Sequence, residues 1–145
     1  MKVFIVWGSP GSGKTTYVRE HMEWGDLIVD LDLIKQSISM EDKTNASFTL
    51  LGTALSIREH LYDLIGRREV TALNAWVVAG LPKREGRIAL KERLNADELI
   101  HIEATKEECI ERAMKDDERT NKDLQMQIID KWFRAYEPEW DDEMW

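Results

Sequence analysis

The sequence predicts an α/β domain, a three-layer sandwich in which helices cover a mostly parallel sheet of about four strands. Short apolar runs alternate along the chain with stretches of helical periodicity, as expected when parallel strands are joined by crossover helices. The first apolar run leads directly into a glycine-rich loop and then a helical segment. A chain of 145 residues is long enough for one such domain and leaves little room for a second.

Each strand is predicted from a short apolar run, and each helix from an amphipathic stripe. The predicted strands span residues 2–7, 27–30, 76–80 and 98–103. The predicted helices span residues 15–22, 33–38, 51–65 and 84–94, and two more follow the fourth strand. Thr105 and Glu108 form a T-x-x-E capping box, which predicts where the next helix starts. The last helix is expected to place on one face Leu124, Ile128, Trp132 and Tyr136.

Charge and composition exclude several classes of protein. The formal net charge is −8, with the acidic excess near the C-terminus, so broad electrostatic binding to nucleic acid or anionic membranes is not expected. The one cysteine, Cys109, excludes an intramolecular disulfide, and the scattered histidines do not suggest zinc. No segment approaches the length of a membrane span, and the N-terminal apolar run is too short for a signal peptide. We therefore expect a soluble protein of the reducing cytoplasm.

The stretch GSPGSGKT, residues 8–15, fits the phosphate-binding pattern G-x-x-x-x-G-K-[ST] at every fixed position. Its glycines allow the backbone to curl so that several N–H groups converge on phosphate oxygens. The following helix directs the positive end of its dipole at the same point. Lys14 is expected to contact the β- and γ-phosphates, and the Thr15 hydroxyl to ligate Mg²⁺. The predicted nucleotide site comprises Gly8, Ser9, Pro10, Gly11, Ser12, Gly13, Lys14, Thr15 and Thr16.

Asp30 and Asp32 follow the second predicted strand, in the stretch IVDLDLIKQSI. The carboxyl ends of the strands form the ligand-binding edge of an open α/β sheet. In an extended chain, side chains two residues apart point the same way, so both carboxylates are expected to face the site. One of them would accept a proton from a substrate hydroxyl or orient that hydroxyl. Alternatively, Asp32 caps a short helix that begins near Leu33.

The pairing of GSPGSGKTT with DLDLIKQSI resembles the small P-loop kinases of the polynucleotide 5′-kinase and zeta-toxin type. This group includes phage and bacterial ATP-binding proteins described as AAA domains. The resemblance implies a P-loop NTPase-like fold, and ATP (or GTP) with Mg²⁺ as cofactors. It follows the order of the elements along the whole chain, whereas the residues that carry it lie in a few short stretches.

One stretch of the sequence, DLDLIKQSI, resembles the part of the family that binds the phosphoryl acceptor. The two are aligned on Gln36 and Ser37. The general base of the polynucleotide kinases then falls on Asp32, and the arginine that helps to hold the acceptor falls on Lys35. A lysine keeps the charge of arginine but loses its bidentate fork. Asp30 lies outside the family position and is given a supporting role in acceptor binding.

The family also places arginines in a lid that closes over the phosphates after the fourth strand. Arg112 matches by its place on the helix after that strand, and Arg119 lies in the polar break that follows. Such arginines stabilise charge on the transferring phosphoryl group. The alternative for each of them is a solvated surface charge. The predicted catalytic side chains are therefore those of Lys14, Asp32, Arg112 and Arg119.

Lys83, Arg84 and Arg87 form the densest basic cluster of the sequence, just after the third predicted strand. The cluster could receive a phosphate or a nucleic-acid end, so Arg84 is assigned to acceptor binding. Alternatively, these are first-turn residues of a helix, although the helix dipole disfavours cations there. No Asp or Glu closes the third strand, which argues against a motor or an AAA-type hydrolase and favours a kinase.

The resulting hypothesis is a phosphotransferase that moves a phosphoryl group from ATP to a hydroxyl acceptor: a polynucleotide 5′-end, a nucleoside or a nucleotide. The kinase-like domain is expected over residues 1–137, with an acidic aromatic tail over residues 138–145. The alternative is a nucleotide-binding or ATPase module that acts through a protein partner, contacted by tail tryptophans such as Trp140 and Trp145. A nucleoside monophosphate kinase is a third alternative, supported by the basic cluster alone. No membrane partner is expected.

Overall fold

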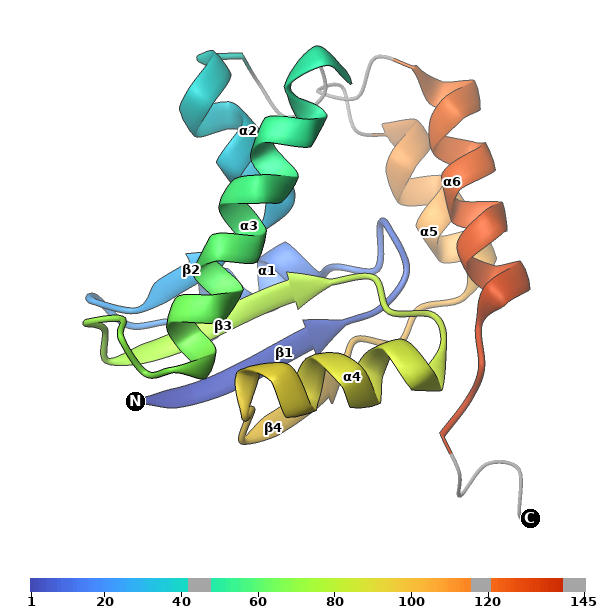
Figure 1. The fold of residues 1–145 in the computed structure, drawn as a ribbon. Helices are drawn as coiled ribbons and strands as arrows, with labels where there is room; N and C mark the ends of the chain where they lie inside the picture. The colour runs from blue at the N-terminus through green and yellow to red at the C-terminus, as the bar shows by residue number, and fades with distance from the viewer. Residues whose placement is uncertain (42–47, 116–120, 140–145) are drawn as a thin grey trace.

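The computed structural model describes residues 1–41, 48–115 and 121–139, and its strands and helices alternate as predicted (Figure 1). The strands are β1 (Lys2–Trp7), β2 (Leu27–Val29), β3 (Asn74–Ala79) and β4 (Glu98–His101). The α-helices are α1 (Lys14–His21), α2 (Leu31–Ser39), α3 (Leu51–Gly66), α4 (Arg84–Leu94), α5 (Lys106–Lys115) and α6 (Lys122–Ala135). A short 3-10 turn, Phe48–Leu50, precedes α3.

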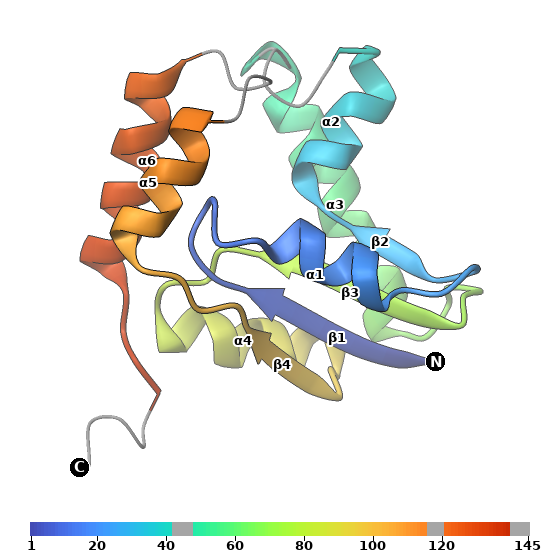
Figure 2. The same cartoon turned by 180° about the vertical axis from the view of Figure 1, so that it is seen from behind.

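The strands form one parallel sheet in the order β2-β3-β1-β4. β1 lies in its interior, where Trp7 pairs with Ala79 of β3 and with His101 of β4. α3 and α4 cover one face of the sheet, and α1 covers the other (Figure 1, Figure 2). The predicted α/β sandwich with a parallel sheet is therefore confirmed. The carboxyl ends of the strands meet at one edge.

Alternate residues of β1 fill the two cores between the layers. Val3 and Ile5 are buried among apolar side chains of α3 and α4, whereas Val6 is buried with Val18 of α1. Because both faces of the sheet are covered, the strand is continuously apolar and does not alternate with polar residues. β1 is thus held from both sides up to Trp7, the residue that precedes the phosphate loop.

α2 begins at Leu31 and not at the predicted Leu33, because Asp30 is its N-cap. The carboxylate of Asp30 accepts hydrogen bonds from the backbone N–H groups of Asp32 (2.8 Å) and Leu33 (3.4 Å). A carboxylate at this position satisfies N–H groups that have no partner within the helix. The prediction that Asp32 lies in extended chain is therefore wrong, and so is the alternative that Asp32 caps the helix.

α5 and α6 form a helical hairpin, referred to below as the arm, which stands beside the carboxyl edge of the sheet (Figure 1). The core of the arm contains Cys109 and Ala113 of α5 and Ile129 of α6, all of them buried. Ile128, predicted to lie on the packed face, is 40% exposed. The small side chains of α5 admit Ile129 in its place.

The start of α5 has the predicted capping box. The N–H of Glu108 donates to the hydroxyl of Thr105 (3.1 Å), and the N–H of Thr105 donates to the Glu108 carboxylate (3.3 Å).

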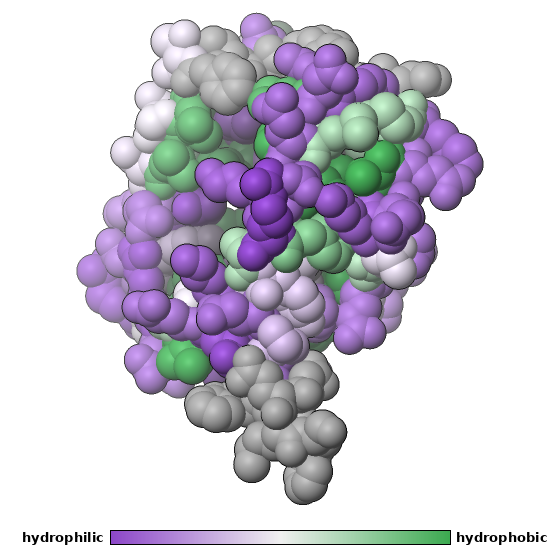
Figure 3. Space-filling model, turned by 90° about the vertical axis from the view of Figure 1, so that its right-hand side faces the viewer, coloured by the Kyte–Doolittle hydropathy of each residue, from purple (hydrophilic) through white to green (hydrophobic). Residues whose placement is uncertain are grey.

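Hydrophilic side chains dominate the face of the molecule on which α6 lies, with smaller apolar patches between them (Figure 3). No helix among the described residues combines the length and the apolar composition that a bilayer crossing requires.

Candidate nucleotide site

The phosphate loop joins β1 to α1 and packs closely on the backbone that follows β4. A Cβ atom at Gly8 would lie 2.6 Å from the carbonyl oxygen of Ile102. At Gly11, where φ is +80°, a Cβ atom would lie 3.0 Å from the carbonyl oxygen of Cys109. Any other residue at these positions would push the loop away from its neighbours. The path of the loop is therefore set by backbone contacts with α5 and the connection that leads to it.

Lys14 is the first residue of α1, and its ammonium donates hydrogen bonds to the carbonyl oxygens of Gly8 (2.8 Å) and Ser9 (2.7 Å). The charge predicted to bind phosphate thus lies at the loop itself. The hydroxyl of Ser12 is buried and has no hydrogen-bond partner within the described part of the chain. Buried polar atoms are nearly always hydrogen-bonded, so this hydroxyl fits a loop that receives a polar ligand.

Thr15 and Asp30 meet beside the loop, where the Thr15 hydroxyl donates to the Asp30 carboxylate over 3.5 Å. Asp30 is only 8% exposed. Burial raises the pKa of its carboxyl, the charge of Asp32 adds to the rise, and backbone N–H donors partly offset it. A hydroxyl and a carboxylate are hard oxygen ligands of the kind that Mg²⁺ prefers. The pair therefore fits the edge of a magnesium site.

A magnesium ion at this pair would need further ligands. Among the residues that the structure describes, no three or more His, Cys, Asp and Glu side chains gather closely enough to hold a metal by themselves. Mg²⁺ commonly keeps several waters and takes its remaining oxygens from one or two carboxylates and from substrate phosphates. The donor set at Thr15 and Asp30 therefore suits a metal that arrives with a nucleotide.

Asp32 lies in the first turn of α2 and is largely exposed. Its side chain is 55% exposed and forms an ion pair with Lys35 (3.6 Å), whose side chain is 18% exposed. The carboxylate that reaches Thr15 is therefore that of Asp30, which the sequence assigned to a supporting role. The Asp32–Lys35 pair stands at the same sheet edge and remains accessible to a second substrate.

Arg112 reaches the phosphate loop from α5. Its guanidinium donates to the carbonyl oxygens of Ser12 (2.8 Å) and Gly11 (3.2 Å), and it lies 3.9 Å from the Glu108 carboxylate. The structure thus brings this sequence-predicted arginine to the loop. Arg119, the second predicted lid arginine, lies outside the described residues.

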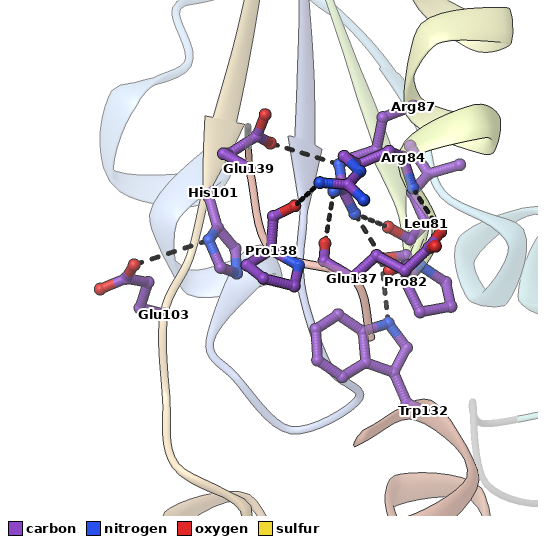
Figure 4. Close-up of polar contacts among 11 residues, drawn as sticks. Leu81, Pro82, Arg84, Arg87, His101, Glu103, Trp132, Glu137, Pro138 and Glu139 are labelled. Carbon is purple, nitrogen blue, oxygen red and sulfur yellow. Dashed lines mark hydrogen bonds and ion pairs between the residues drawn. The ribbon is translucent and has the colours of Figure 1, made fainter. Parts of the chain in front are cut away.

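Arg84 and Arg87 of the predicted basic cluster bind the segment that follows α6 (Figure 4). Arg84 donates to the carbonyl oxygen of Pro138 (3.1 Å), and the buried Arg87 donates to that of Glu137 (2.6 Å). Lys83 is the exposed member of the three. The cluster is therefore not one open basic patch, and acceptor binding by Arg84 stays a prediction. Main-chain acceptors leave no mark in a sequence, so the pattern of residues could not reveal these contacts.

A family model described as AAA domain matches residues 3–138. The chain belongs to this family. The domain is P-loop kinase-like, so the resemblance to small P-loop kinases is confirmed. The matched segment of this AAA domain contains the phosphate loop, both aspartates of the acceptor stretch and Arg112. Its third strand ends at Ala79 without a carboxylate, as in the sequence prediction.

Two solved structures resemble this AAA domain. A chain of the Pnkp1/Rnl/Hen1 RNA repair complex matches 94% of it with a TM-score of 0.62 at 18% identity. The AAA domain spans 46% of that chain, which is less than half of its length. TT1252 from Thermus thermophilus matches 99% of the AAA domain, and 84% of its own chain, with a TM-score of 0.54 at 14% identity. At these identities the likeness concerns the fold. No curated protein sequence matches the chain.

Proposed function

We propose that this AAA domain transfers a phosphoryl group from ATP, with Mg²⁺, to a hydroxyl acceptor: a polynucleotide 5′-end, a nucleoside or a nucleotide. The observation that carries the proposal is the meeting of a phosphate loop and an accessible carboxylate at one sheet edge. The ammonium of Lys14 contacts the loop, Thr15 contacts Asp30 beside it, and Asp32 is exposed two residues after Asp30, in the first turn of α2. The kinase-like family and the likeness to a chain of an RNA repair complex support the same reaction class.

On the donor side, the loop N–H groups and the N-terminus of α1 would bind the phosphates, and Lys14 would add a point charge. Thr15 and Asp30 would hold Mg²⁺, which neutralises phosphate charge when it is bound. Arg112, which already contacts the loop, would stabilise charge on the transferring group. Arg119 is proposed for the same role.

On the acceptor side, Asp32 would take the proton of the attacking hydroxyl as its oxygen bonds to phosphorus and ADP leaves. The Asp30 carboxylate is less suited to this step, because it is buried and accepts hydrogen bonds at the start of α2. Lys35, which pairs with Asp32, would hold a polar group of the acceptor as a point charge. The two sides together would align acceptor, phosphoryl group and leaving group.

The test is phosphoryl transfer from γ-labelled ATP to a panel of acceptors: 5′-hydroxyl oligonucleotides, nucleosides, nucleoside monophosphates and amino sugars. We expect Asp32→Asn to lower the transfer rate about 100-fold or more, with ATP binding unchanged, because general-base catalysis contributes that much. Asp123→Asn is the matched control, since Asp123 is also an exposed residue in the first turn of a helix. An Asp32→Asn variant as fast as the unaltered protein would show that the base is wrongly assigned.

The same assay separates the kinase from the alternative function. Tight ATP binding without labelling of any acceptor would favour a nucleotide-binding module that acts through a protein partner. Residues 140–145, which contain the tail tryptophans predicted for such a contact, lie outside the described residues.

A further inference from the structure

Arg87 of α4 is a charged side chain that is only 2% exposed, and it joins segments that are far apart in the sequence (Figure 4). Its Nη1 donates to the carbonyl oxygens of Leu81 (2.9 Å) and Pro82 (3.1 Å), and its Nη2 donates to that of Glu137 (2.6 Å). A buried guanidinium is costly unless its charge and its N–H groups find partners. Three carbonyls accept from Nη1 and Nη2, and Nε lies 3.3 Å from the carboxylate of Glu139. The side chain thus ties the turn before α4 to the segment after α6.

The same guanidinium lies over Trp7, the last residue of β1. Its central carbon is 4.1 Å from the centroid of the Trp7 ring, which also stacks on His101 of β4 at 3.7 Å. Such cation–aromatic contacts are strongest where water is excluded. Trp7 directly precedes Gly8, whose carbonyl oxygen accepts a hydrogen bond from Lys14. Fixing the Trp7 ring therefore fixes the entrance to the phosphate loop.

The C-terminal end of α6 makes further contacts with the turn before α4. The indole N–H of Trp132 donates to the carbonyl oxygen of Gly80 (3.0 Å), and the N–H of Glu137 donates to that of Pro82 (2.7 Å). Tyr136 stacks on Trp132 with ring centroids 5.0 Å apart. The residues of this junction are referred to below as the clasp: Trp7, Gly80, Leu81, Pro82, Arg87, Trp132, Tyr136 and Glu137.

The clasp holds the arm at the C-terminal end of α6, and Arg112 contacts the phosphate loop from α5 of the same arm. α5 and α6 pack chiefly against each other, so the orientation of the arm depends on a few further contacts. These are the clasp at the end of α6 and the close approach of Gly11 to Cys109 of α5. Arg112 donates to the carbonyl oxygens of Ser12 and Gly11. A change at the foot of α6 would therefore alter how Arg112 sits on the phosphate loop.

We propose that Arg87 is a positioning residue of the nucleotide site. Through the clasp, it holds the entrance of the phosphate loop and the arm that carries Arg112 in the geometry that binds phosphates. The inference rests on the proposed nucleotide binding at residues 8–15. It does not depend on which acceptor takes the phosphoryl group, so the two proposals can fail separately.

The test compares Arg87→Met and Arg87→Lys with Arg93→Met. Arg93 is a matched control on the same helix: its guanidinium lies 5.3 Å from the centroid of Tyr62, and it bonds Asp63 of α3 (3.0 Å). Both arginines thus combine a ring contact with hydrogen bonds, but Arg93 joins α4 to α3 and takes no part in the clasp. Calorimetry with ATP and Mg²⁺ gives the dissociation constant, and thermal unfolding gives Tm.

We expect Arg87→Met to weaken ATP binding about tenfold or more, and Arg87→Lys to weaken it about threefold, since an ammonium cannot replace the fixed fork. Arg93→Met is expected to lower Tm while the dissociation constant for ATP stays within about twofold of the unaltered protein. Equal ATP affinity in the unaltered protein and the Arg87 variants, or an equal loss in Arg93→Met, would overturn the inference. Normal ATP binding without phosphoryl transfer would overturn the proposed reaction alone.

Trp132→Phe keeps the inference testable if Arg87→Met does not fold. It removes the indole N–H that donates to Gly80 and leaves a ring to stack on Tyr136. We expect a folded variant, by circular dichroism, whose ATP affinity is about two- to threefold weaker. Unchanged ATP affinity in both Trp132→Phe and Arg87→Lys would overturn the positioning role.

Discussion

The donor side and the acceptor side of the sheet edge are built in different ways. On the donor side, backbone carbonyls of the phosphate loop bind the ammonium of Lys14 and the guanidinium of Arg112. On the acceptor side, Asp32 and Lys35 lie on one turn of α2 and pair with each other at 3.6 Å. The donor side is thus made by the path of the backbone, and the acceptor side by side chains on one helix.

The difference shows which part of the site can vary without a change of fold. A Cβ atom at Gly8 would meet a backbone oxygen at 2.6 Å, so a substitution there would move the loop itself. We expect that Asp32 and Lys35 can be replaced without altering the course of α2, because their side chains form an ion pair with each other. Recognition of the donor is therefore part of the fold, whereas recognition of the acceptor can change one side chain at a time.

Lys14→Met should have the largest effect, because it removes the charge that the loop surrounds. We expect kcat/KM for ATP to fall about 100-fold or more. Lys35→Met is the matched control, since it removes the same charge from the acceptor side and should leave ATP affinity unchanged while raising the acceptor KM. Calorimetry measures ATP affinity, and steady-state transfer assays measure kcat/KM for ATP and KM for the acceptor. A similar loss of ATP affinity in both variants would contradict the assignment of Lys14 to the donor side and Lys35 to the acceptor side.

Arg112→Met tests whether the arm belongs to the donor side. Loss of a charged donor at the loop should lower kcat about tenfold. Lys115→Met is the control, because Lys115 lies on the same helix but is exposed and pairs with Glu111 (2.7 Å). Transfer rates at saturating ATP decide the matter: if the two variants were equally fast, Arg112 would be a surface charge without a role in transfer.

Asp30→Asn tests the buried carboxylate. Burial, together with the Asp32 charge, raises the pKa of Asp30 in the folded protein above its ordinary value of 3.8. The folded state therefore binds this proton more tightly than the unfolded state, so stability falls as pH rises from 3.8 through the folded-state pKa, and the cost is fully present above it. Neutral asparagine should raise Tm at neutral pH and flatten its pH dependence.

The same substitution should weaken the use of Mg²⁺, because Asp30 contacts Thr15. We expect the Mg²⁺ concentration for half-maximal transfer to rise about fivefold to tenfold. Thermal unfolding between acidic and neutral pH, combined with Mg²⁺ titration, measures both effects. A lower Tm at neutral pH would contradict the raised pKa of Asp30, and an unchanged Mg²⁺ requirement would separate Asp30 from the donor side.

Lys35→Arg should have the smallest effect, and we expect it to change acceptor binding alone. An arginine fork can bind two oxygens at once, so KM for an acceptor that carries a phosphate should fall about twofold to threefold. Acceptors with and without a phosphate, compared at fixed ATP, provide the measurement. A change in ATP affinity would contradict the placement of Lys35 on the acceptor side.

The donor side could be predicted from the sequence because its residue pattern allows few geometries. The spacing of glycines before Lys14 predicted a phosphate loop, and the ammonium of Lys14 lies at that loop. The T-x-x-E pattern at Thr105 predicted a cap for the same reason, since both hydrogen bonds are local in sequence. Local patterns of this kind need no knowledge of distant segments.

Features that depend on distant segments could not be predicted in this way. Asp30 and Asp32 both fit a helix cap, and only the observed end of β2 at Val29 decides between them. Ile128 and Ile129 both fit an apolar stripe, and the choice between them is made by the small side chains of α5. In the sequence, Arg87 belongs to a basic cluster. Its hydrogen-bond acceptors are main-chain carbonyls from two other parts of the chain, which the pattern of residues does not reveal.

The clasp also bears on the order in which the protein is completed during synthesis. β1 and the phosphate loop leave the ribosome early, whereas Glu137, which Arg87 binds, is added more than a hundred residues later. With Arg87 positioning the loop as proposed, a nascent or truncated chain that contains all of GSPGSGKTT but stops before the end of α6 should bind ATP poorly. The motif that is translated first would become functional last.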